Sequence, residues 1–380
     1  MEMIYVYYAV ILIILVAGIK ISGVKKYNEE FLSLQQCKAV QGICAVLIIF
    51  HHMSQQVDYE TPLKYFGNVG IYFVAIFFFC SGYGLIKNLR VKENYLDGFL
   101  KKRLITVLVP LYFINFIYII YEWTAGNFDA LSGKELGMEL FYQIVGLKLP
   151  CGKAWYMVVI TFLYIFFYIL FKHCKEVLAF VGMAVVILAY VFLGLYRDHG
   201  EYVWWVEGEW WYNTVLIFYI GMLFARFESS IVKVLKKGYV VLLPLSAVAV
   251  VTSYNFSIWC LDNYSYYCEY DPTYTRVEII LTRLVSYSSQ VLTLTCFVFF
   301  ILLIMLKVRV GNPILKFLGK ISLEIYLIHD LFIQIFHSPA CNLPKVPQYA
   351  IAVVLCSIAS SVILYFIIGK INGFLLKAKK

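Results

Sequence analysis

Long apolar runs dominate this sequence and constrain what it can fold into. About 20 consecutive apolar residues span a bilayer as a helix, and only a helix or a closed barrel satisfies its own backbone groups there. Only 14% of the residues are charged, against roughly 25% in a soluble domain. The sequence therefore predicts an all-α, polytopic membrane protein. Its eleven predicted spans are 3–20, 39–55, 69–86, 104–122, 154–171, 177–195, 210–226, 239–258, 284–306, 319–337 and 348–369.

Lysine and arginine give these spans a direction. With this set of spans, 24 of the 32 basic residues fall on one side of the membrane. Basic residues concentrate on the cytoplasmic side, so we expect a multi-pass protein of the plasma membrane with its N-terminus outside and its C-terminus in the cytoplasm. The net charge of +9 then reflects this bias and attraction to anionic lipids. It does not indicate nucleic-acid binding.

The second span carries polar groups on one helical face. Gln41 and His52 are eleven residues apart and differ by only about 20° around a helix axis, and Lys38 lies within about 40° of His52. His51 points about 100° away from this line. An imidazole titrates near neutral pH and suits a general base acting on a hydroxyl. A histidine that is simply hydrogen-bonded within the bundle is the alternative.

The tenth span has a second polar stripe. Ser322, Tyr326 and His329 are spaced i, i+4 and i+7, which places them on one face of a helix. Ionisable groups at membrane depth line cavities or mark working sites, so this face is expected to point into the bundle. Glu324 lies on the far side, near the cytoplasmic end, where an interfacial position is expected.

The third span and the loop after it combine small and basic residues. Ser81 and Gly82 allow close helix approach, so helix packing is the favoured role for this segment. Lys102 and Arg103 belong to a dense basic cluster that follows the span. Topology alone accounts for such a cluster, although it would also bind an anionic group such as a nucleotide phosphate.

An aromatic pair and the cysteines are interpreted as structural features. Trp155 and Tyr156 open the fifth span, where aromatic residues usually anchor a helix at the membrane interface. The ten cysteines are scattered without metal-ligand spacing, so no metal site is expected. Cys260 and Cys268 share one polar loop and could form a disulfide there if that side is oxidising.

Taken in order, these segments resemble the membrane acyltransferase type 3 family, the O-antigen acetylase-like acyltransferases. That family shows a basic residue and a glycine with a histidine eleven positions after the basic residue, a Phe-Phe-x-x-Ser-Gly-Tyr signature, a basic pair before a proline, a Trp-Tyr pair, and Gly-x-x-Ser-x-x-x-Tyr-x-x-His. The matching residues are Gln41-Gly42 with His52, Phe77 to Tyr83, Lys102-Arg103 with Pro110, Trp155-Tyr156, and Gly319 with Ser322, Tyr326 and His329.

The resemblance implies a core of about ten helices. The first predicted span lacks the basic start and cleavage site of a signal peptide, so we expect it to remain as one extra helix. The expected organisation is an additional N-terminal transmembrane helix and linker over 1–32, an acyltransferase membrane domain over 33–373, and a basic cytoplasmic tail over 374–380.

The resemblance also implies an activity and roles for residues. An integral membrane O-acyltransferase would move an acyl group, most often acetyl, from acyl-CoA to a hydroxyl of a cell-surface or lipid-linked carbohydrate, without a metal. The implied catalytic residues are His52, His329 and Tyr326. The implied donor-binding residues are Lys38, Gln41, Lys102, Arg103, Ser81 and Tyr83. A third group with acceptor-binding or structural roles comprises His51, Trp155, Tyr156 and Ser322.

One departure and one rival function accompany this interpretation. Gln41 stands where the family keeps a basic residue. Either Lys38 supplies the charge, or the donor is bound differently, or activity is reduced.

The rival function is that of a transporter or flippase of a glycan or lipid-linked intermediate, which would use the same polar faces as a substrate pathway. Transporters often contain inverted repeats, and the sequence shows none. It does not specify the oligomeric state.

Overall fold

The computed structural model describes residues 5, 6, 9, 12–14, 16–57, 61–198, 203–310, 312–338, 341, 343 and 345–377. The chain is 78% helical, which confirms the predicted all-α, polytopic membrane fold. In the described part, eight helical segments are long and apolar enough to cross a membrane. Their principal helices are α2 (Leu34–Ser54), α3 (Gly70–Val91), α4 (Phe99–Thr124), α6 (Trp155–His173), α7 (Glu176–Tyr196), α9 (Glu228–Asn263), α10 (Arg276–Met305) and α13 (Val346–Lys377).

Two predicted spans differ from a single long helix. The span at 210–226 contains only α8 (Leu216–Arg226), whose 11 residues cover about 16 Å at 1.5 Å per residue. The span at 319–337 is split at Ile321 into α11 (Pro313–Lys320) and α12 (Ser322–His337). The first predicted span, 3–20, is described only in part, and its described residues 5, 6, 9, 12–14 and 16 are helical. The other predicted spans each coincide with a long helix.

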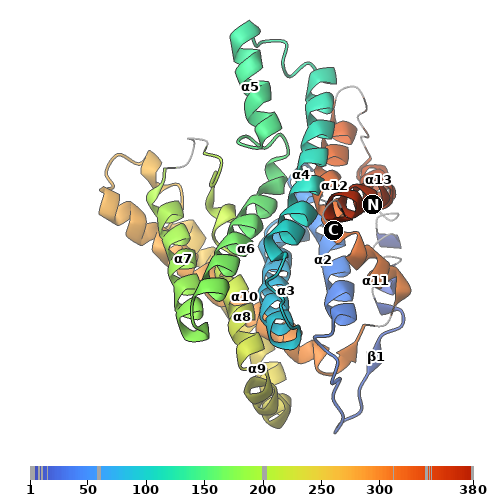
Figure 1. Cartoon of the computed structure of the whole chain (residues 1–380), viewed down its shortest axis with the longest axis vertical. Helices are drawn as coiled ribbons and strands as arrows, with labels where there is room; N and C mark the ends of the chain where they lie inside the picture. The colour runs from blue at the N-terminus through green and yellow to red at the C-terminus, as the bar shows by residue number, and fades with distance from the viewer. Residues whose placement is uncertain are drawn as a thin grey trace.

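The loops contain structure that the apolar pattern did not predict. Helix α5 (Gly133–Val145) begins with a capping box formed by Ser132 and Glu135, and lies at the top of Figure 1 beside the upper part of α4. Cys260 and Cys268 are both free thiols, so the suggested disulfide between them is not formed. The short elements are η1 (Pro62–Phe66), η2 (Gly152–Ala154), η3 (Glu209–Trp211), η4 (Cys268–Tyr270) and the antiparallel pair β1 (Lys20–Ile21) and β2 (Val308–Arg309).

Glycines allow two pairs of helix backbones to approach closely. A Cβ atom on Gly319 of α11 would lie 1.7 Å from the carbonyl oxygen of Lys38 on α2. A Cβ atom on Gly82 of α3 would lie 2.0 Å from the carbonyl oxygen of Phe218 on α8. Small residues serve this purpose in membrane bundles because they bring backbones within contact distance. The packing role expected for the third-span glycine is therefore what the structure shows.

These close contacts put α2 among four other helices of the bundle. Helix α2 packs against α3, α11, α12 and α13, and in Figure 1 it runs between α3 and α11. Its two ends therefore carry polar side chains toward opposite ends of the same group of helices.

The contact at Gly319 gives a stability prediction. Gly319→Ala should lower the melting temperature of the detergent-purified protein, because overpacking a tight contact costs about 1–3 kcal/mol. Gly369→Ala is the matched control, since a Cβ atom on Gly369 meets nothing within 4 Å. Equal melting temperatures for the two variants would contradict the close approach of α2 and α11.

Candidate functional site

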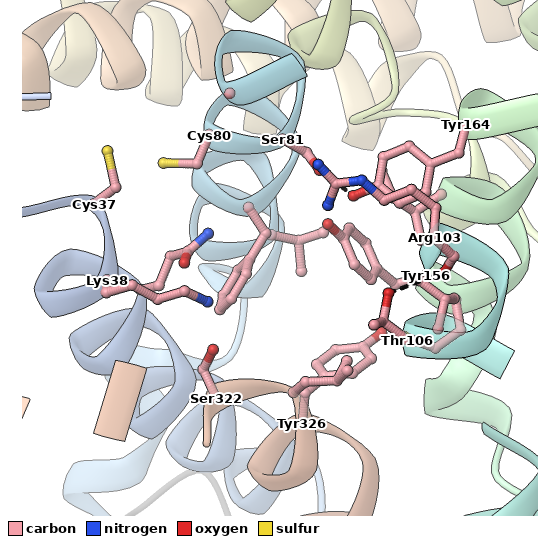
Figure 2. Close-up of a pocket in the computed structure, with 18 of the residues that line it drawn as sticks. Cys37, Lys38, Cys80, Ser81, Arg103, Thr106, Tyr156, Tyr164, Ser322 and Tyr326 are labelled. Carbon is pink, nitrogen blue, oxygen red and sulfur yellow. Dashed lines mark hydrogen bonds between the residues drawn. The ribbon is translucent and has the colours of Figure 1, made fainter. Parts of the chain in front are cut away.

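A polar cavity of about 380 Å³ lies between the start of α2, the later part of α3, and the beginnings of α4, α6 and α12. We call it the first cavity. Figure 2 shows side chains from these five helices pointing toward one open space. Its polar lining residues are Lys38, Gln41, Ser81, Asn88, Arg103, Thr106, Tyr156, Tyr164, Ser322 and Tyr326.

The first cavity is cationic. Lys38 and Arg103, which we call the cationic pair, both line it, and none of its described lining residues is a carboxylate. The guanidinium of Arg103 donates to the Tyr95 hydroxyl at 2.9 Å and lies over the Tyr164 ring at 5.1 Å. These contacts fix its planar group in place, which suits recognition of an anion such as phosphate.

A second cavity, of about 610 Å³, lies at the opposite ends of α2 and α3. Its wall also includes η2, the segment 207–214, and parts of α9 and α10. The lining contains His51, His52 and Lys153. It also contains three carboxylates, which we call the carboxylate rim: Glu207, Glu209 and Asp262.

The two cavities share lining residues. Val74 and Tyr326 line both of them, so only these side chains and their neighbours separate one cavity from the other. The Tyr326 hydroxyl donates a hydrogen bond to the backbone carbonyl of Lys153, and its ring packs edge-on against Tyr156 with centroids 5.8 Å apart. Tyr326 therefore stands at the junction of the cavities.

A cluster of histidine rings lies beside this junction. The rings of His52 and His329 stack with centroids 5.1 Å apart and planes inclined by 25°. The ring of His51 is 4.7 Å from that of His52. His329 is fully buried and 6.2 Å from the Tyr326 ring. The predicted catalytic residues His52, His329 and Tyr326 thus lie together, although His52 and His329 come from different helices.

Hydrogen bonds determine which ring nitrogens carry protons. The Nδ1 atoms of His51 and His329 contact the carbonyl oxygens of Phe66 and Ile325 at 2.9 and 3.1 Å. A carbonyl only accepts, so each Nδ1 must donate, and the neutral ring keeps its lone pair on Nε2. In the described part of the chain the Nε2 atom of His329 has no hydrogen-bond partner.

A hydrogen bond from Gln55 likewise determines which nitrogen of His52 carries the proton. Its Oε1 lies 3.0 Å from the Nδ1 of His52, and its Nε2 lies 3.5 Å from the Nε2 of His51. An amide oxygen accepts, so Nδ1 of His52 donates and Nε2 retains the lone pair of a base. Gln55 therefore links two histidines that line the same cavity.

His51 lies on a different face of α2 from His52, as the sequence predicts, and yet it reaches the same cavity. Its ring lines the second cavity together with His52 and packs over Gly70, where a Cβ atom would lie 2.2 Å from the ring. His51 and His52 both lie in the last turn of α2, which ends at Ser54, and the second cavity contacts both of them.

Two other expectations need correction. Trp155 does not anchor an interface: it is 7% exposed, lines the second cavity and packs near Trp211. Glu324 is not solvent-exposed: it is 6% exposed and interacts electrostatically with Lys38. In both cases the side chain packs inside the protein, which the sequence pattern of a single helix does not reveal.

The implied donor-binding set is only partly brought together. Lys38, Gln41, Ser81 and Arg103 line the first cavity, as do Tyr156 and Ser322 from the third group. Tyr83 and Lys102 are not among its described lining residues. The Tyr83 hydroxyl donates to Glu228 on α9 at 3.0 Å, and the side chain of Lys102 is exposed.

Several polar residues of the second cavity lie near the histidines in a way that no sequence pattern predicts. Lys153 acts electrostatically on His51, His52 and His329. Partial burial raises the pKa of Glu207, and the nearby Lys153 ammonium opposes that shift. These residues lie in irregular segments far apart in sequence, so no spacing pattern linked them to the histidines.

The described residues contain no group of three His, Cys, Asp or Glu side chains that could hold a metal ion. The functional groups that lie at the junction are imidazole rings, a lysine ammonium and a tyrosine hydroxyl.

Comparison with known proteins gives one match. Residues 37–367 match a family model, acyltransferase 3, that is described as an acyltransferase domain. No curated protein and no solved structure matches the chain. The matched range includes every residue of the histidine cluster and of both cavities except Leu34.

The first cavity predicts a difference in thiol accessibility. Cys80 lines this cavity, whereas Cys44 is fully packed in the core. In variants that keep only one of the ten cysteines, a water-soluble, charged methanethiosulfonate should modify Cys80 at least about tenfold faster than Cys44, since such reagents need solvent access. Similar rates would mean that the first cavity is closed to water. Faster reaction in inside-out vesicles than in right-side-out vesicles would place the cavity at the cytoplasmic face.

Proposed function

The chain belongs to the membrane acyltransferase type 3 family, and from this we propose that it transfers an acyl group from acyl-CoA to a carbohydrate hydroxyl. Acetyl is the proposed acyl group, and the acceptor is a cell-surface or lipid-linked glycan. The proposed site is a passage through the plasma membrane, with the N-terminus outside and the C-terminus in the cytoplasm.

One observation carries the proposal. A cationic cavity and a cavity with a carboxylate rim meet at Tyr326, beside the stacked rings of His52 and His329. A donor and an acceptor that enter from opposite faces need such an arrangement, because their reactive atoms must meet at a base.

The first cavity suits coenzyme A. Its phosphates would bind the cationic pair, and its uncharged pantetheine arm would follow the lining between Cys80 and Tyr156 toward Tyr326. Lys38 is three residues, or about one helical turn, from Gln41, and both line the cavity. Lys38 thus supplies the positive charge that the family keeps at the position of Gln41.

The chemistry at the junction follows from the free Nε2 of His52. The acceptor hydroxyl oxygen bonds to the thioester carbonyl carbon while His52 takes the hydroxyl proton. The carbon–sulfur bond then breaks, and the coenzyme A thiolate leaves with the proton that His52 returns. An acyl-His52 relay gives the same products in two steps, with the acyl group carried briefly on the ring nitrogen.

Two neighbouring residues complete this scheme. Lys153 is a cation that acts on all three histidines, and it would stabilise the oxyanion that forms on the thioester carbonyl. His329 stacks on His52 but is not among the described residues lining either cavity. We therefore assign His329 a positioning role, in which it holds the His52 ring at the junction.

A flippase would also use two meeting cavities, and the break between α11 and α12 is a feature found in transporters. Membranes supplied with radiolabelled acetyl-CoA distinguish the two functions. Label in the glycan supports acyl transfer, whereas glycan movement across the membrane without label supports the flippase. Mass spectrometry of the surface polysaccharides, with and without this protein, identifies the acceptor.

The role of His52 predicts a large loss of activity. His52→Ala should reduce acetyl transfer by roughly 10²–10⁴-fold, the usual contribution of a general base, with unchanged protein levels in the membrane. His337→Ala is the matched control, because His337 is exposed at the end of α12 and lines neither described cavity. Undiminished transfer by His52→Ala would remove this residue from the mechanism.

The cationic pair predicts a defect in donor binding. Lys38→Met and Arg103→Met should each raise the KM for acetyl-CoA about tenfold, because each removes a charge-assisted contact to phosphate. With S-acetyl-pantetheine, which lacks the phosphates, both variants should match the unmodified protein. Lys92→Met, at an exposed residue after α3, serves as the control for lost surface charge. An equal defect with both donors would show that the pair does not bind phosphate.

A further inference from the structure

The two cavities differ in the predominant sign of their charged lining residues. The first cavity has the cationic pair, whereas the second has the carboxylate rim against the single cation Lys153 among its described lining residues. Carboxylates accept hydrogen bonds from hydroxyls and ammonium groups, and they repel anions. The two cavities are therefore suited to molecules of different charge.

The wall of the second cavity is held by a hydrogen-bond network. Gln290 of α10 accepts from the Tyr266 hydroxyl at 2.8 Å and from the Asn213 amide at 3.3 Å. Gln290 and Asn213 line the cavity, and all three residues are buried. This network joins the segment before α8 to the loop after α9.

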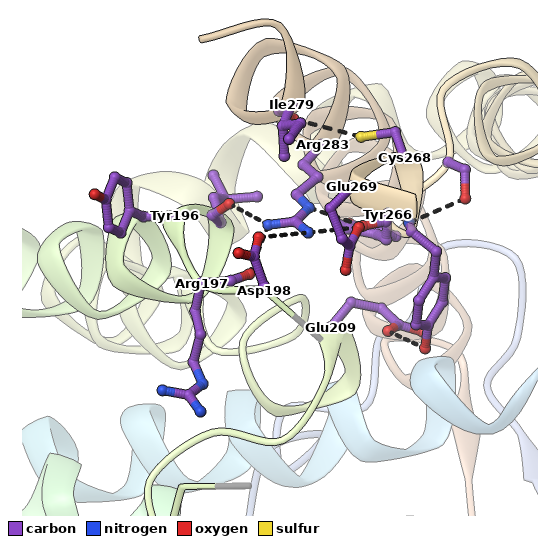
Figure 3. Close-up of polar contacts among 12 residues, drawn as sticks. Tyr196, Arg197, Asp198, Glu209, Tyr266, Cys268, Glu269, Ile279 and Arg283 are labelled. Atoms are coloured by element: carbon purple, nitrogen blue, oxygen red, sulfur yellow. Dashed lines mark hydrogen bonds and ion pairs between the residues drawn. The ribbon is translucent and has the colours of Figure 1, made fainter. Parts of the chain in front are cut away.

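A buried arginine holds the same two loops. Arg283 has no exposed surface, and its guanidinium donates to the Tyr266 carbonyl at 2.7 Å and pairs with Glu269 at 2.7 Å. It also donates to the carbonyl oxygens of Leu195 and Arg197. Figure 3 shows this group between the end of α7 and the loop after α9.

One rim carboxylate, Glu209, is held in place by a hydrogen bond, and the other two are its neighbours in the same wall. Glu209 accepts from the Tyr267 hydroxyl at 3.1 Å, one residue from the Tyr266 carbonyl that Arg283 holds. Glu207 is two residues earlier in the same segment, and Asp262 is at the end of α9. The carboxylate rim is thus part of a wall of the second cavity that hydrogen bonds and an ion pair hold together.

The second cavity also offers an aromatic surface. Trp210 lines it, and its ring packs against Gly208, where a Cβ atom would lie only 2.2 Å from the ring. Tyr72 and Tyr254 line the same cavity. A flat, apolar surface beside hydrogen-bonding carboxylates fits the ring face and hydroxyls of a sugar.

Building on the proposed function, we propose that the second cavity selects an uncharged or cationic carbohydrate acceptor and excludes anionic ones. Like charges brought together in an interface disfavour the wrong partner strongly. Uronate-containing acceptors would place a carboxylate against the carboxylate rim, whereas neutral sugars and amino sugars would bind to it through hydroxyl or ammonium groups.

Three trisaccharides of equal length test the selectivity: maltotriose (neutral), chitotriosan (cationic, fully deacetylated) and trigalacturonate (anionic). Binding to the purified protein is measured by tryptophan fluorescence, since Trp155 and Trp210 line the cavity. We expect the anionic sugar to bind at least about tenfold more weakly than the neutral one, because of like-charge repulsion. Label transfer from acetyl-CoA should show the same order among the sugars.

A double variant tests the cause of this selectivity. Glu207→Gln with Asp262→Asn should bring the affinity for trigalacturonate to within about threefold of that for maltotriose, because it removes two of the repelling charges. Asp129→Asn is the control, since Asp129 is an exposed carboxylate beyond α4 that is not among the lining residues of the second cavity. It should leave the order unchanged.

The outcomes separate this inference from the proposed function. Equal binding of all three sugars, no binding by any of them, or an unchanged ratio in the double variant would overturn the acceptor inference. The binding assay does not depend on turnover. Charge-selective binding without acetyl transfer would therefore sustain the inference about the cavity and contradict acyl transfer. Label transfer without charge selection would support acyl transfer and contradict the inference about the cavity.

Discussion

The cost of placing polar groups in hydrocarbon is the constraint on which this structure depends. Helices α2 and α12 carry lysine, glutamine, histidine, serine and tyrosine side chains along spans of otherwise apolar residues. Such groups are stable at membrane depth only where protein or water surrounds them. The bundle meets this requirement by turning the polar face of α2 toward α3 and α12. Glycines support this arrangement, because the backbone contact at Gly42 and Gly319 brings α11 against α2, and α12 follows directly after α11.

The same constraint also limits where the backbone can depart from a regular helix. Backbone that is not helical survives at membrane depth only when it is buried in protein or lines a cavity. The segment before the short helix α8 is deeply buried at Trp211 and Tyr212, and its neighbours Asn213 and Thr214 line the second cavity. The break at Ile321 likewise comes just before Ser322, which lines the first cavity. The departures from regular helices therefore occur next to the places where polar groups gather.

The sequence predicted more of the first cavity than of the second. Lys38, Gln41, Ser322 and Tyr326 were recognised from helical spacing, and α2 and α12 are regular over these residues, so angular arguments apply. The second cavity draws on η2, the segment 207–214 and the ends of α9 and α10. Its charged residues lie in turns or at helix ends, where no periodicity exists to show which way a side chain points. Gln55, at the C-cap of α2, was missed for the same reason.

The sequence alone determined that this chain crosses a membrane, that its elements are helices, and which faces of two helices must avoid lipid. These properties follow from segment length, hydropathy and the 3.6-residue period, all of which are local. Only the tertiary structure decided that His52 stacks on His329, that Tyr326 stands between two cavities, and that Arg283 secures the loops around one of them. Those contacts join residues far apart in the chain, and they depend on how helices cross and where their ends meet, which no local pattern encodes.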